Sequence, residues 1–250
     1  MKFGLQLCLA LLALFFVTGT AMADCKGLPD HAALQKALQA SVKPSGGPSN
    51  GGLDLNMWAT VVDRDGIVCQ VAFSGKDRGD QWPGSRAISA QKANTANAFS
   101  LDGLALSTAN LFTAVQPGHS LFGLQDSNPV DTAVAYAGPS VAYGTPKDPM
   151  DGKKIGGVNV FGGGLALYAG GKIVGALGVS GDTSCADHNI AWRVRKALSL
   201  GTVPAGVSAN KDDGIIYDID ATGVSKGGYG HPTCGGSEPT VAVSIGAGTK

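Results

Sequence analysis

The chain has 250 residues, of which 38 are glycine and only 15% are charged. Glycine is therefore about twice as frequent as in an average globular protein, and charged residues fall well below the usual share of about 25%. The 19 basic and 19 acidic residues cancel, which argues against a nucleic-acid-binding protein, because such proteins usually carry a basic excess. Hydrophobic residues make up 44%, so the chain is long and apolar enough to bury a core.

The first residues have the pattern of a secretory signal peptide. Lys2 gives a positive start, residues 5–17 are almost wholly apolar, and Ala21-Met22-Ala23 fits a small-residue cleavage site. We therefore predict a signal peptide over residues 1–23 and a periplasmic or secreted protein. An uncleaved anchor is the alternative, although the apolar run is shorter than the roughly 20 residues of a membrane helix. We expect no membrane span after cleavage, because no later segment is long and apolar enough.

The cysteines agree with export. Cys8 lies in the predicted signal peptide, which leaves Cys25, Cys69, Cys185 and Cys234. An even number in an exported chain predicts two disulfides, with three possible pairings. We prefer Cys25–Cys69 with Cys185–Cys234, because this pairing ties each terminal segment to the core. Free buried thiols are the alternative.

The first half of the mature chain predicts a helix, a hairpin and a second helix. Residues 30–43 are amphipathic, with Asp30 as a capping residue. Two β-rich runs, 57–62 and 67–73, flank an Asp-Gly turn and predict a hairpin. Residues 85–101 form an alanine-rich helix, whose small side chains favour close packing against a sheet or another subunit.

The second half predicts a further hairpin and helix. A helix is expected over 104–115, and residues 116–157 read as loops with short helical or strand pieces. Strands are expected over about 165–168 and 172–179, followed by a helix over 185–200.

The remaining features concern glycine. Gly175 and Gly178 lie inside the predicted strand 172–179, where glycine marks a bulge or the close approach of another backbone or a ligand. Residues 201–250 are a Gly-rich, irregular extension in which only 241–245 (VAVSI) predicts a strand.

Three segments carry a resemblance to a known family. They are WATVVDRDGIVCQVAFSG (58–75), SAQKANTANAF (89–99) and GGKIVGALGVSGDTSCADHNIA (170–191). In their order and motifs they resemble the GlcG/HbpS haem-binding family, as an exported member with long insertions. The resemblance implies an α+β fold in which helices flank a central antiparallel sheet, related to profilin-like and PAS-like sensors. It also implies a family domain over 24–200, on which the extension 201–250 would pack, and assembly into homo-oligomers.

The resemblance also implies a ligand pocket where the strand 172–179 meets the helix 185–200. We expect Lys92, Ser180, Asp187 and His188 to line it. The helix start would offer free amides to an anionic group, and Lys92 would suit a haem propionate. His188 is the best candidate for the haem iron, because histidine is its usual protein ligand. The alternative is that His188 is a surface or capping residue.

A second histidine extends the metal hypothesis. If Cys234 pairs with Cys185, His231 approaches His188, and the two could hold haem or a transition metal. An ordered contact of the tail is the alternative for His231. The chain has no CxxCH motif, which excludes covalently attached c-type haem.

Two classes of function follow. The first is an exported protein that binds a small ligand, haem above all, for uptake, storage or sensing. The second is a small-molecule enzyme that uses Lys92, Asp187 and His188 as acid–base groups. Ser89 and Lys92 also match the SxxK spacing of serine acyl-enzymes, but the accompanying motifs are missing. No complete catalytic set is visible, so whether the protein is an enzyme stays open, as does an interaction scaffold without a ligand.

Overall fold

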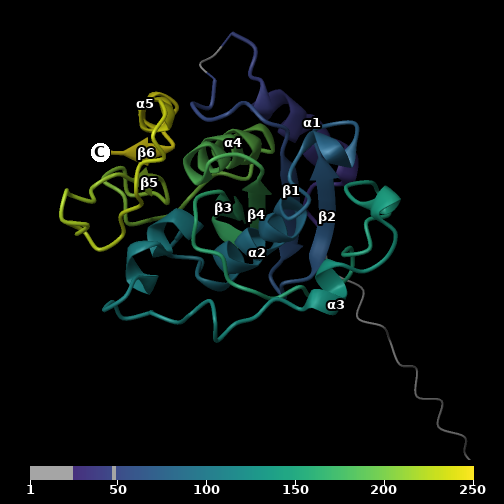
Figure 1. Ribbon diagram of the computed structural model, residues 1–250, viewed down its shortest axis with the longest axis horizontal. Coiled ribbons are helices and arrows are strands. Elements are labelled where there is room, and N and C mark those ends of the chain that lie inside the picture. Colours follow the sequence, from purple (N-terminus) through teal and green to yellow (C-terminus); the bar gives the residue numbers. More distant parts are fainter. Residues whose placement is uncertain (1–24, 47–48) are drawn as a thin grey trace, which may run out of the picture.

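The computed structural model describes residues 25–46 and 49–250, so the predicted signal peptide lies outside the described residues. Its centre is a four-stranded antiparallel sheet with the strand order β2-β1-β4-β3 (Figure 1). Helices cover both faces of this sheet, which confirms the expected α+β class. Among the described residues, no helix is long and apolar enough to cross a membrane.

The sheet consists of two hairpins joined side by side. The first pairs β1 (Trp58–Asp63) with β2 (Val68–Phe73), and the second pairs β3 (Gly164–Ala169) with β4 (Lys172–Ser180). The side chain of Asp63 accepts hydrogen bonds from the amides of the first turn, at 2.9 Å each. Such carboxylate–amide bonds fix a tight turn, and both predicted hairpins are confirmed.

One face of the sheet is covered by α2 (Ser85–Ala98), whose alanines are buried against β1 and β4. Gly178 permits this contact, because a Cβ at this position would collide with the carbonyl oxygen of Ser89. The structure therefore confirms the prediction that another backbone approaches a glycine of this strand closely. It also means that α2 packs on the sheet rather than offering its alanines to a second subunit.

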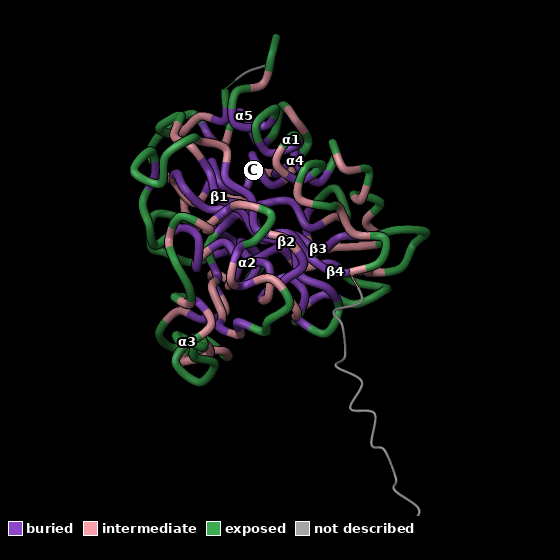
Figure 2. The backbone as a smooth tube through the Cα atoms, turned by 90° about the vertical axis from the view of Figure 1, so that its right-hand side faces the viewer, coloured by how far each residue is buried: buried purple, intermediate pink, exposed green. Residues whose placement is uncertain are grey.

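The opposite face is covered by α1 (His31–Val42) and α4 (Ser184–Ala197), which also contact each other. Asp30 caps α1, as expected, by accepting a bond from the amide of Ala33. The core between these helices and the sheet is mainly aliphatic and buried. Figure 2 shows the strands that carry it largely in purple, the colour of buried residues. The largest members of this core are Leu34, Leu38, Leu165, Leu167 and Leu177.

The prediction of one continuous helix over residues 104–115 is wrong. The structure has two short 3-10 helices there, Thr108–Leu111 and Thr113–Val115. Asn110 and Thr113 direct their side chains to distant carbonyls, those of Gly214 and Gly230. Side chains that bond outside their own turn compete with a continuous helix. The following segment is loop-rich, as predicted, with one short α-helix, α3 (Thr132–Ala135), and one 3-10 helix, Ser140–Ala142.

The C-terminal extension lies beside α4 and contains α5 (Glu238–Ser244), β5 (Ile215–Ile216) and β6 (Gly248–Thr249) (Figure 1, yellow). The strand expected over 241–245 is wrong, because most of this segment belongs to α5. Pro239 near the start of α5 and Gly246 after its end, at φ +75°, are the local features that favour a helix.

Candidate functional site

A cavity of about 330 Å³ lies where α2, the end of β4 and the start of α4 meet, and we call it the Lys92–Asp187 pocket. Its volume is at the lower end of the range for small-ligand sites. Three of the four expected site residues line it, and the fourth does not. The lining residues are Trp82, Ser85, Ile88, Lys92, Asn159, Phe161, Ser180, Asp182, Ser184 and Asp187.

Lys92 and Asp187 form a buried ion pair at this pocket. The Lys92 amine lies 2.6 Å from a carboxylate oxygen of Asp187, and each residue is only 2% exposed. The amine also donates to the carbonyl of Val179 at 3.3 Å, and the other Asp187 oxygen accepts from the amide of Asp182 at 2.8 Å. Because both charges are removed from water, each depends on the other for compensation.

Burial raises the pKa of Asp187 from 3.8 to about 6, while the Lys92 charge opposes this shift. The carboxylate is therefore ionised at neutral pH, but it accepts a proton far more readily than an exposed aspartate. A carboxyl with a raised pKa next to a cavity is a common feature of functional sites.

Most amides at the start of α4 are already bonded within the protein, so few remain for an anionic ligand. The amide of Thr183 donates to Asp182, and the amides of Ala186 and Asp187 donate to the side chain and carbonyl of Thr183. Asp182 also accepts a bond from the amide of Leu53 at 2.8 Å. The carboxylate of Asp182 thus occupies the helix start, where the ligand's negative charge was expected.

His188 does not line the Lys92–Asp187 pocket. It is fully buried and faces the extension, where its Nε2 lies 3.1 Å from the carbonyl oxygen of Ala247. Its Nδ1 has no hydrogen-bond partner among the described residues. Burial lowers the pKa of His188 to about 3, so the ring is neutral. Successive residues of a helix are rotated by about 100°, which is why Asp187 and His188 face different surroundings.

His231 is buried at the start of α4, beside the disulfide. Its Nδ1 lies 2.7 Å from the Pro232 carbonyl oxygen, and its Nε2 lies 3.4 Å from the hydroxyl of Ser184. Burial lowers the pKa of His231 to about 4. It therefore reaches a residue of the pocket wall without lining the pocket itself.

The structure contains both bonds of the preferred disulfide pairing, Cys25–Cys69 and Cys185–Cys234. The second bond brings His231 to α4, with its Nδ1 3.9 Å from the sulfur of Cys185. Cys185, His231 and Cys234 thus have the composition of a metal site. Both cysteines are committed to the disulfide, however, so neither supplies the thiolate that binds a metal.

The SxxK arrangement is not formed in the structure. The Ser89 hydroxyl is buried and bonds to the Arg86 carbonyl and to the hydroxyl of Thr60, at 2.7 Å each. Lys92 points to Asp187 instead. A serine activated by this lysine would need a direct hydrogen bond between the two side chains.

Two pocket residues that the sequence reasoning missed are aromatic and exposed. Trp82 is 53% exposed and Phe161 is 42% exposed, and both line the pocket together with the half-buried Ile88. The available signal was a single tryptophan in the otherwise polar loop 74–84, which on its own does not mark a contact surface, because isolated exposed apolar side chains are common.

Comparison with known proteins places the chain in a family. Solved structures similar to it include a complex of PduOC with haem, at 25% identity, covering 68% of this chain and 93% of the other, with a TM-score of 0.46. Klebsiella pneumoniae protein ORFY, of the DUF336 family, is 24% identical, with coverages of 68% and 90% and a TM-score of 0.45. No curated protein matched. Residues 32–195, well over half of the chain, match the family described as haem degrading protein HbpS-like, and the chain therefore belongs to the HbpS-like family.

Proposed function

We propose that this is an exported small-ligand-binding protein whose ligand, haem in the first place, occupies the Lys92–Asp187 pocket. The observation that carries the proposal is the composition of the pocket lining. It combines two exposed aromatic side chains, Trp82 and Phe161, with the buried Lys92–Asp187 ion pair. Ligand sites combine apolar walls with a few polar groups in this way. The pocket also lies wholly within the segment that matches the HbpS-like family.

The pocket fits haem in one respect and not in another. Its aromatic walls suit a flat, largely apolar macrocycle. No histidine lines the pocket, so the iron–histidine bond expected from the sequence does not fit. The Lys92 charge is already compensated by Asp187, which leaves it a poor partner for a propionate. The proposal therefore rests on the walls, and we derive no iron chemistry for this chain.

The test is a haemin titration followed through the Soret band. We expect saturable binding that is weakened about 10-fold or more in Trp82→Ala/Phe161→Ala, since aromatic contacts contribute about 1 kcal/mol each beyond buried area. Phe122→Ala, which removes an exposed phenylalanine outside the pocket, is the matched control. Unchanged affinity in the double variant would show that haem does not bind at these walls.

The histidines provide a second arm of the same test. His231→Gln should leave the haemin spectrum and affinity unchanged, and so should His188→Gln if its melting temperature shows that it remains folded. A spectral change in either folded variant would mean that a histidine reaches the iron. The pocket assignment would then be wrong.

A second candidate is an enzyme that moves protons through the Lys92–Asp187 pair. The raised pKa of Asp187, about 6, favours it, because proton transfer is most efficient when the group titrates near the working pH. The HbpS-like family is described as haem degrading, so the assay is loss of haem absorbance with ascorbate in air. Asp187→Asn should abolish the loss while haemin still binds. An equal rate in this variant would contradict the candidate.

Export and assembly complete the proposal. Two disulfides suit an oxidising compartment, so we propose a periplasmic or secreted protein whose mature chain begins at Asp24. Intact mass before and after reduction and alkylation tests this. A homo-oligomer remains our expectation, although the alanines of α2 are not its contact surface, and light scattering of the purified protein tests it.

A further inference from the structure

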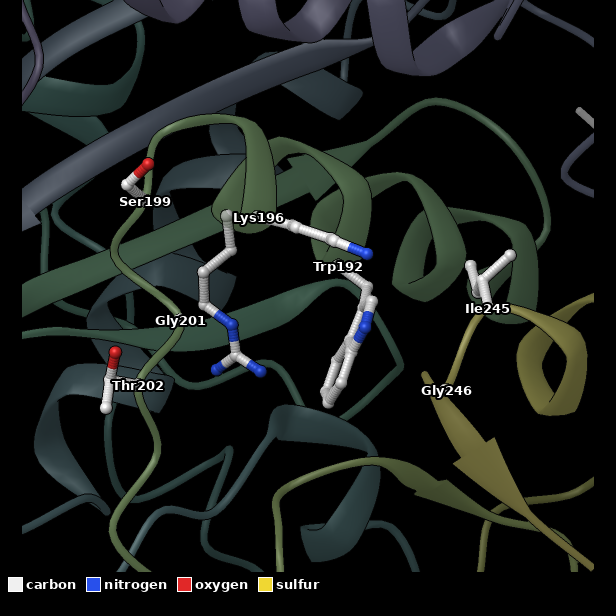
Figure 3. A pocket seen from close by; sticks show the side chains of 8 residues that line it. Trp192, Lys196, Ser199, Gly201, Thr202, Ile245 and Gly246 are labelled. Atoms are coloured by element: carbon white, nitrogen blue, oxygen red, sulfur yellow. The ribbon is translucent and has the colours of Figure 1, made fainter. Parts of the chain in front are cut away.

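The larger of two cavities at α4 lies at the other end of this helix, outside the Lys92–Asp187 pocket. It has a volume of about 500 Å³, well within the range of small-ligand sites. Figure 3 shows Trp192 and Lys196 on α4, with residues 199–202 on one side and Ile245 and Gly246 on the other. The family match ends at residue 195, so most of this cavity is built by the part of the chain that follows.

We propose that this cavity, the Trp192–Lys196 pocket, is a second binding site and that it takes a small aromatic carboxylate. The inference is independent of the haem proposal, because the two cavities share no lining residue.

One wall of the cavity contains a buried ion pair whose two charges balance each other. Arg195 is buried and donates to both carboxylate oxygens of Asp213, at 2.6 and 2.7 Å, and to the carbonyl of Ala166 at 3.1 Å. Its guanidinium also lies 4.6 Å from the ring centroid of Trp192. This bidentate pair holds the indole in place, and its two charges cancel.

Lys196 then sets the charge of the cavity. No acidic residue is among its lining residues, and no described carboxylate forms an ion pair with the exposed Lys196. Three of the last four carbonyls of α4, those of Val194, Arg195 and Lys196, already accept bonds from the amides of residues 198–200. An ammonium group without an ion-pair partner among the described residues favours an anionic ligand.

The remaining groups define the shape and polarity of that ligand. The hydroxyls of Ser199 and Thr202 make no side-chain hydrogen bond to another described residue, so both are available to a carboxylate. The half-buried indole of Trp192 and the side chain of Ile245 provide an apolar surface for a flat ring. Together these groups match an aromatic ring that carries a carboxylate.

The experiment is calorimetric titration of the full mature chain with 2-naphthoate and with 2-naphthamide, its neutral analogue. We expect one saturable naphthoate site and at least 10-fold weaker binding of the amide. Lys196→Gln should weaken naphthoate about 10-fold and leave the amide unchanged, because the variant removes only the charge-assisted bond. Trp192→Leu should weaken both compounds.

Two controls test whether naphthoate binds in this cavity and not elsewhere on the protein. Lys147→Gln removes another exposed lysine that does not line the cavity, and should bind naphthoate as the wild type does. Lys196→Gln should bind haemin normally, and Phe161→Ala should bind naphthoate normally. The proposal is overturned if naphthoate shows no saturable binding, if Lys196→Gln binds it as tightly as the wild type, or if Phe161→Ala abolishes its binding.

Discussion

The two ends of α4 each place a buried ion pair beside a cavity, but they draw on different parts of the chain. At the first end, Asp187 pairs with Lys92 on α2, and the whole lining lies within the family segment. At the second end, Arg195 pairs with Asp213 in the extension. The first pair joins α2 to α4, the helices on opposite faces of the sheet, whereas the second pair fastens the extension to α4. The comparison shows that the extension adds a cavity that the family segment does not form alone.

Removing the carboxylate at the second end should have the largest effect. Asp213→Ala leaves the buried guanidinium of Arg195 without its partner, and we expect a loss of about 3–5 kcal/mol in the free energy of unfolding. Urea denaturation measures it. Asp126→Ala, at an exposed position, should change stability by less than about 0.5 kcal/mol. A loss below about 1 kcal/mol for Asp213→Ala would show that the pair does not fasten the extension.

The first end should differ from the second by its dependence on pH. Lys92→Met leaves Asp187 buried without its cation, and we expect a loss of about 3 kcal/mol at pH 8. The pKa of Asp187, already about 6, then rises further, because the Lys92 charge that lowers it is gone. A carboxyl whose folded pKa lies above its unfolded value favours folding at low pH and loses that contribution as the pH rises. The loss should therefore be clearly smaller at pH 5.

The measurement compares the variant with the wild type at both pH values, so that the buried histidines, present in both proteins, cancel. Lys36→Met, at an exposed position on α1, should show no such dependence on pH. Equal losses at pH 5 and pH 8 for Lys92→Met would mean that Asp187 does not take up a proton when its partner is removed.

The smallest effect is expected at the turn that follows α4. Ser199 has φ +57°, in the left-handed region where glycine is the usual residue after a helix. Ser199→Gly should raise the stability by about 0.5–1 kcal/mol, since it relieves the Cβ strain. Ser199→Ala, which removes the hydroxyl but keeps the Cβ, should bring no gain. The naphthoate affinity of the two variants then reports the contribution of the hydroxyl separately from the backbone strain.

Most of the sheet and its covering helices could be predicted because their sequence periods are clear. Asp30 marks the start of α1, the Asp-Gly turn after Asp63 marks the first hairpin, and Gly178 marks the contact with α2. These signals are local, and each depends on a few neighbouring residues. The grouping of Lys92, Ser180 and Asp187 at one pocket came instead from the family resemblance, and all three line the Lys92–Asp187 pocket.

The parts that could not be predicted depend on contacts between distant segments. The turns around Asn110 are fixed by the carbonyl of Gly214, far along the chain. The environment of His188 is set by Ala247, in an extension with no regular apolar period. The amides at the start of α4 are a different case, because they are engaged mainly by the neighbouring residues Asp182 and Thr183. Only the bond from the amide of Leu53 to Asp182 joins distant segments.

The order of the disulfides along the chain has a consequence for biosynthesis. Cys25 bonds to Cys69 and Cys185 to Cys234, with separations of 44 and 49 residues, so the two loops follow one another without overlap. Each bond therefore joins cysteines that are neighbours in order of synthesis. The first can close while the rest of the chain is still emerging. Once the predicted signal peptide with Cys8 is removed, the second has no earlier unpaired cysteine left to attack. Vectorial oxidation alone yields the native connectivity, without the reshuffling that interleaved bridges require.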